Sequence, residues 1–213
     1  MISLKNFYDP KEVAAFTESL PRVRKDIGKI PFANRTATYG VGANTFRAYR
    51  DWQVQPSLVY REWASCICDS LVPNELEVEI SEPEGFVHWH TALGDSLQTH
   101  WKSRQGKEKE LSFAHTYKFV DLFVKWLSSH DLGHPPLVDA LVKHANCALD
   151  SQTLQKINEC LSLALPISRP SMGDVHSRVT YEYCQGLIGE FASDHGGTRL
   201  LFDYFAWREG GGR

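Results

Sequence analysis

The chain has 213 residues, 42% of them hydrophobic, and a net charge of −3. This length and composition suit one compact domain with a substantial core; two helical lobes, about 1–110 and 111–213, are the alternative. The slightly negative net charge gives the protein as a whole no attraction for nucleic acid, so any contact with DNA must come from a local basic patch. We expect a monomer.

The five cysteines are odd in number and lack paired CxxC spacing, which argues against a disulfide framework or a zinc ribbon. The amino-terminal residues show no basic stretch followed by a long apolar one. No run of about 18 apolar residues occurs anywhere. These features predict a cytoplasmic protein without a membrane span.

The first pattern along the chain is a short helix over residues 8–20, closed by Pro21. The stretch 22–50 is then strongly basic and rich in Gly, Asn and Thr. Arg35, Arg47 and Arg50 lie in it. Cations beside small polar residues and backbone donors are what phosphate contacts need, so we interpret these arginines as candidate DNA-binding residues. A solvated basic loop is the alternative.

Residues 56–72 carry apolar side chains at helical spacing, and Pro73 ends that segment. Glutamates then alternate with Leu76, Val78 and Ile80. This alternation predicts a short strand or an extended acidic rim, and thus a small β element near residues 76–90. So many acids would repel DNA, and we expect them to lie away from any DNA-binding face.

Histidines and aromatic residues are densest over 86–101. His88 and His90 would point to one side of a strand and, with Asp95 or His100, could ligate a metal. The spacing matches no established zinc motif. We therefore interpret these histidines as packing or surface residues, and we predict neither a metal nor a cofactor.

From Ser112 the pattern is strongly helical. Lys118, Asp121 and Lys125 cluster on a side separate from the apolar face, as in a solvated face with i, i+3 and i, i+4 ion pairs. Glycine and proline break the chain over 128–136, and Pro136 suits the first turn of a new helix. Asp139 then falls in that first turn, where a carboxylate also interacts favourably with the helix dipole.

The combination of these two helices resembles the catalytic core of the helix-hairpin-helix DNA glycosylases, particularly the 8-oxoguanine DNA glycosylase branch. The matching residues are Lys118-x-x-Asp121, a short break, and Pro136-x-x-Asp139 opening a helix. By this resemblance Lys118 would attack the sugar C1′, while Asp139 would help deprotonate it and stabilise the cationic sugar. The glycine-rich hairpin of that family is absent from Leu111–Tyr117, so a divergent branch is implied.

The remaining patterns predict helices near 154–165 and 181–191, a loop over 168–174, and an aromatic helix at 200–207. Tyr204 and Trp207 of the last helix are candidates for a wall that stacks on an extruded base, although aromatic residues more commonly pack in a core. His134, in the break before Pro136, is a further candidate DNA-binding residue.

Together the sequence predicts a mainly α-helical protein that flips and excises a damaged or modified base, such as a phage-modified one, with Lys118 and Asp139 as the catalytic pair. Lysine attack would permit strand cleavage; attack by a water that Asp139 activates would leave an abasic site. A non-catalytic helical protein that binds nucleic acid or another protein is the main alternative. A metal-dependent hydrolase with a site formed by His88, His90 and His100 is a third hypothesis.

Overall fold

The computed structural model describes residues 4–32, 38–162, 164–165 and 169–209, and these form a mainly α-helical fold, as the sequence predicts. The α-helices are α1 Pro10–Asp26, α2 Pro56–Asp69, α3 Pro73–Ile80, α4 Pro83–Gln105, α5 Phe113–Ser128, α6 Pro135–His144, α7 Ser151–Cys160, α8 Arg178–Asp194 and α9 Arg199–Glu209. The 3₁₀ helices are η1 Leu4–Phe7, η3 Ala43–Tyr49 and η4 Met172–Asp174. None of the helices in the described ranges is both long enough and apolar enough to cross a membrane.

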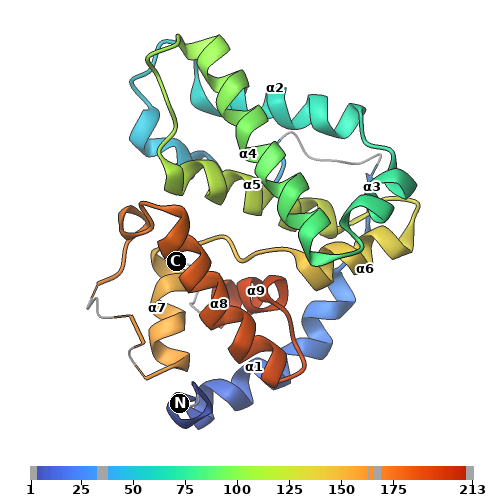
Figure 1. Cartoon of the computed structure of the whole chain (residues 1–213), viewed down its shortest axis with the longest axis vertical. Coiled ribbons are helices and arrows are strands. Elements are labelled where there is room, and N and C mark those ends of the chain that lie inside the picture. Colours follow the sequence, from blue (N-terminus) through green and yellow to red (C-terminus); the bar gives the residue numbers. More distant parts are fainter. Residues whose placement is uncertain (1–3, 33–37, 163, 166–168, 210–213) are drawn as a thin grey trace.

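The helices form two groups (Figure 1). Helices α2 to α5 make the upper group, and α1, α7, α8 and α9 make the lower one. Each group has its own hydrophobic cluster, and α5 contributes to both: Phe119 and Phe123 pack in the upper cluster, and Tyr117 in the lower one. The amino-terminal helix α1 therefore packs with the carboxy-terminal helices, above all α9.

Helix α1 is longer than the sequence predicted, because it continues through Pro21 to Asp26. A proline inside a helix removes one hydrogen bond and costs about 3 kcal/mol. The buried face of α1 explains the continuation. Phe16 and Leu20 lie on this face before Pro21, and Val23, which has no exposed surface, extends it beyond Pro21. Tertiary burial of this face offsets the local cost of Pro21.

The predicted β element near residues 76–90 is wrong, because this stretch belongs to helices α3 and α4. Pro73 occupies the first turn of α3, where a proline is tolerated. Leu76 and Ile80, one helical turn apart, are both buried, so alternation with glutamate here reflects two sides of a helix. Among the described residues the strands instead form one short parallel pair, β1 Ile30–Pro31 with β2 His130–Asp131.

The helical conformation of α4 also separates the histidines. His90 is buried, whereas His88, two residues away and on another side of the helix, is exposed. Within the described residues, no group of three or more His, Cys, Asp or Glu side chains is placed to hold a metal ion. None of the five cysteines, all of them in the described ranges, forms a disulfide, and Cys66 alone among them is exposed.

Asp121 does not belong to a solvated face, contrary to the sequence-based expectation. It is buried, with its carboxylate 2.7 Å from His90 Nε2 and accepting hydrogen bonds of 2.9 and 3.0 Å from the Tyr181 hydroxyl. Burial raises the pKa of Asp121, and these hydrogen bonds oppose that rise. The network joins α4, α5 and α8, and so connects the two helical groups.

Gly40 allows the loop before η3 to approach α5 closely. Its φ is +83°, and a Cβ at this position would lie 2.6 Å from the Leu122 carbonyl oxygen and 2.7 Å from Trp126 Cβ. A Gly40→Ala substitution should therefore lower the free energy of unfolding by about 2 kcal/mol or more, measured by urea denaturation. Gly42→Ala is the matched control, because a Cβ there meets nothing within 4 Å. Equal effects of the two substitutions would contradict this account.

Candidate functional site

Lys118 lines a cavity of about 580 Å³ between the start of η3, one face of α5, and α9. We call it the lysine cavity. Its lining is mostly apolar, includes the rings of Trp126, Tyr204 and Trp207, and carries two cations, Lys118 and Lys125. No Asp or Glu is among the described residues that line it. A mostly apolar lining with aromatic rings suits a planar or apolar group.

Helix α5 places both lysines on the cavity side. Its first turn is capped by Ser112, whose side chain accepts a hydrogen bond from the backbone N–H of His115. Lys118, Leu122, Lys125 and Ser129 follow at spacings of three or four residues, and such spacing places side chains on one face of a helix. The cavity wall is therefore one stripe of α5.

The partner of Lys118 is Asp150, the residue that caps helix α7. Lys118 Nζ lies 3.3 Å from Asp150 Oδ2, and only 12% of the lysine side chain and 9% of the aspartate side chain are exposed. The other oxygen, Oδ1, accepts hydrogen bonds from the backbone N–H groups of Gln152 and Thr153. One carboxylate thus caps a helix with one oxygen and faces the lysine with the other.

A second lysine and carboxylate pair lies beside the first. Lys125 forms an ion pair with Asp203 of α9, whose side chain is fully buried, and its Nζ lies 4.4 Å from the centre of the Tyr204 ring. Asp203 Oδ2 also accepts a hydrogen bond of 2.7 Å from the backbone N–H of Ala148. This pair therefore connects α5 and α9 to the segment that leads into Asp150.

The segment before Asp150 is held on both sides. The Gln185 side chain accepts a hydrogen bond from the Cys147 N–H at 3.0 Å and donates one to the Cys147 carbonyl at 2.7 Å. The Asp150 N–H donates to the Thr153 hydroxyl, which completes a capping box. These contacts fix the Asp150 carboxylate against Lys118 before any ligand binds.

His115 lies one turn before Lys118, and the positive charge of Lys118 affects the pKa of His115. Burial against Tyr49 and Phe119 and then the positive charge of Lys118 lower the pKa of His115 to about 4, from an ordinary value of 6.5. The neutral imidazole is therefore the form that the folded protein favours. Its Nδ1 lies 2.8 Å from the Ser112 hydroxyl.

This shift predicts a pH dependence of stability. A histidine whose pKa is lower in the folded state than in the unfolded state stabilises the fold above pH 6.5, and that stability is lost as the pH falls toward 4. When the pH falls from about 7 to about 4.5, the free energy of unfolding of His115→Gln should therefore decrease by about 1 kcal/mol less than that of the parent. Urea denaturation at the two pH values measures this, with the exposed His88→Gln as control. Parallel pH curves for parent and His115→Gln would contradict it.

Tyr204 and Trp207 line the lysine cavity, so the structure brings these two predicted residues together with Lys118. Asp139 lies elsewhere. Helix α6 begins at Pro135, which makes Asp139 its fifth residue instead of a first-turn residue, and its exposed side chain lines a different cavity beside Arg24 and Lys29. The carboxylate that Lys118 meets is that of Asp150.

The predicted DNA-binding residues are dispersed. Arg47 and Arg50 line a smaller cavity of about 240 Å³ at η3, the helix whose Asn44 and Thr45 line the lysine cavity. His134 precedes α6 with its Nε2 4.0 Å from a Glu77 carboxylate oxygen. Arg35 lies outside the described residues.

Sequence reasoning missed Asp150 and Asp203. Asp150, followed by Thr153 and an apolar helical pattern, carries the signal of a helix cap, which predicts a local role but no lysine partner. Asp203 sits within an aromatic helix and gives no local signal at all. Both contacts with α5 depend on the packing of helices that are distant in sequence.

The fold and site define a helical protein with a cavity that is lined by aromatic side chains and by Lys118, a nearly buried lysine whose amine also contacts the Asp150 carboxylate behind the lining. Comparisons of this chain with protein families, with curated proteins and with solved structures find no match.

Proposed function

We propose that this protein is a DNA glycosylase that excises a damaged or modified base from DNA, with Lys118 as the nucleophile. The observation that carries the proposal is the nearly buried Lys118, which lines the lysine cavity and has its Nζ 3.3 Å from the Asp150 carboxylate. The sequence resemblance to the helix-hairpin-helix glycosylases supports the same lysine.

The chemistry of the pair fits this reaction. Lysine must lose a proton before it attacks, and a carboxylate at hydrogen-bond distance can accept that proton when bound DNA excludes water. The amine would then form a bond to C1′ as the glycosidic bond breaks, and the base would leave with the bonding electrons and take up a proton. The proton that the base takes up would be the one that Asp150 accepted from Lys118, so that the Asp150 carboxylate is ionised again and can stabilise the positive charge on the sugar.

The walls of the cavity fit an extruded base. Tyr204 and Trp207 offer aromatic faces for stacking. Arg47 and Arg50, from the helix that closes one side of the cavity, would contact phosphates. In this proposal Asp150 takes the role that the sequence resemblance gave to Asp139.

The test is incubation of the purified protein with duplexes that carry 8-oxoguanine or uracil, and with phage DNA that carries modified bases, followed by alkali. A parallel sample receives borohydride, which traps a Schiff base. Alkali-revealed breaks with a trapped adduct would support lysine attack, and breaks without an adduct would support attack by an activated water. DNA that stays intact on all substrates would instead favour a non-catalytic protein that binds nucleic acid or another protein.

A further inference from the structure

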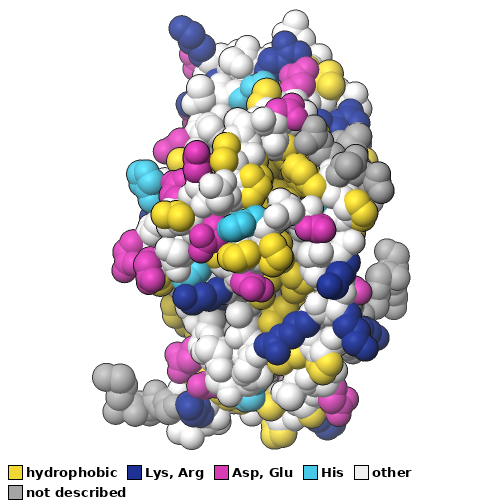
Figure 2. All heavy atoms as spheres, turned by 90° about the vertical axis from the view of Figure 1, so that its right-hand side faces the viewer, with side chains coloured by type: hydrophobic (Ala, Val, Ile, Leu, Met, Phe, Trp, Pro, Cys, Tyr) yellow, Lys and Arg dark blue, Asp and Glu magenta, His cyan; other side chains and the backbone are white. Residues whose placement is uncertain are grey.

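Acidic residues are concentrated in one part of the chain. Residues 62–101 contain eight Asp and Glu and no Lys or Arg, so that all 23 Lys and Arg of the protein lie outside this stretch. In the structure this stretch forms most of α2, all of α3 and most of α4. On the face that Figure 2 shows, acidic side chains gather at mid-height on the left and basic ones lower on the right.

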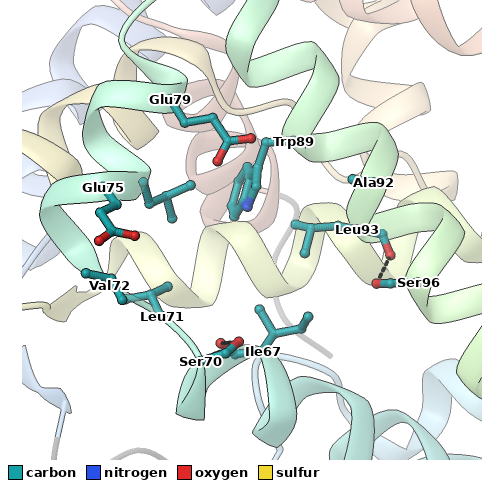
Figure 3. A pocket seen from close by; sticks show the side chains of 11 residues that line it. Ile67, Ser70, Leu71, Val72, Glu75, Glu79, Trp89, Ala92, Leu93 and Ser96 are labelled. Atoms are coloured by element: carbon teal, nitrogen blue, oxygen red, sulfur yellow. Dashed lines mark hydrogen bonds between the residues drawn. The ribbon is translucent and has the colours of Figure 1, made fainter.

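A groove of about 360 Å³ opens among these three helices (Figure 3). Apolar side chains from all three helices line it, including Ile67, Leu76 and Leu93, and the Trp89 ring stands at one end beside Glu79. We call it the acidic groove. It shares no lining residue with the lysine cavity.

Glu75 and Glu79 border this groove from α3, one turn apart. Both are exposed, and among the described residues neither forms an ion pair with a Lys, Arg or His. Like charges at this spacing on a helix disfavour each other by a few tenths of a kcal/mol, so a cation bound between them would be stabilising. Val72, at the start of α3, is 44% exposed and extends the apolar lining to the surface.

We propose that the acidic groove binds a protein partner through an amphipathic segment whose apolar side chains are flanked by Lys or Arg. The apolar lining supplies the contact area, and the carboxylates on α3 select a cationic flank by charge complementarity. The same carboxylates repel phosphates, which argues against DNA in this groove. The proposal does not rest on the glycosylase function.

The test uses two fluorescein-labelled synthetic helical peptides with the same leucine stripe, one flanked by lysines and one by glutamates. Fluorescence anisotropy with the full chain should show binding of the lysine peptide and little binding of the glutamate peptide. Glu75→Lys with Glu79→Lys should weaken the lysine peptide about tenfold or more and strengthen the glutamate peptide. Glu18→Lys with Glu108→Lys, two exposed sites outside the groove, is the control of equal charge.

Two further measurements decide what occupies the groove. Trp89→Ala, with its fold checked by circular dichroism, should weaken the lysine peptide, because the ring lines the groove. If the parent binds both peptides equally, or if the groove and control double variants behave alike, the proposal is wrong. A dimer seen by sedimentation in the parent and lost in the Glu75 and Glu79 double variant would also overturn it, because the occupant would then be a second copy of this chain.

Discussion

Lys118→Gln is expected to abolish base excision, with a loss of at least about a thousandfold in the single-turnover rate. Glutamine is one bond shorter than lysine and still donates hydrogen bonds, but it has no amine to attack C1′. Because Asp150 keeps both backbone hydrogen bonds that cap α7, folding and DNA affinity should change little. Single-turnover incision and a gel-shift assay measure the two properties separately.

The carboxylate partner can be tested in the same way. Asp150→Asn keeps the cap, since the amide oxygen still accepts from the Gln152 and Thr153 N–H groups, but removes the charge that faces Lys118. We expect a loss of about a hundredfold or more in excision. Asp139→Asn, at the other cavity, should have little effect on the rate.

Lys143→Gln, an exposed lysine at the end of α6, is the matched control for loss of one positive charge. A Lys118→Gln protein that cuts as fast as the parent would show that the site is misassigned. If Asp139→Asn slowed excision while Asp150→Asn did not, the assignment from sequence resemblance would hold instead of the one from geometry.

Asp121→Ala is expected to cost about 3 kcal/mol or more of the free energy of unfolding, the largest stability effect among the substitutions considered. The variant leaves His90 and the Tyr181 hydroxyl without their shared partner inside the protein, and it opens a space where three helices meet. Urea denaturation followed by circular dichroism measures the change.

The exposed Asp139→Ala is the control for Asp121→Ala, and it should stay within about 0.5 kcal/mol of the parent. Tyr181→Phe removes one donor from the network and keeps the ring, so it should cost about 1 kcal/mol. A small loss for Asp121→Ala, no greater than that of Tyr181→Phe, would mean that the network contributes little to stability.

The sequence predicted most helices because their signals are local. The apolar spacing of 56–72 and 112–127, and the break at 128–136 with Pro136 in the first turn of the next helix, depend only on neighbours within a few turns. The errors arose where tertiary burial overrides such signals. Pro21 lies inside α1, and the glutamates around Leu76 belong to a helix, because each helix has a face that the core buries.

What the sequence determined by itself is the helical class, the approximate helix boundaries and Lys118 as the residue to test, since periodicity and caps are properties of short stretches. The tertiary structure alone decided that Lys118 meets Asp150 and not Asp139, that Lys125 meets Asp203, and that Asp121 lies in the core. A carboxylate gains its role from what it faces, and that is fixed by how α5 packs against α7, α8 and α9. No pattern within a single helix carries this information.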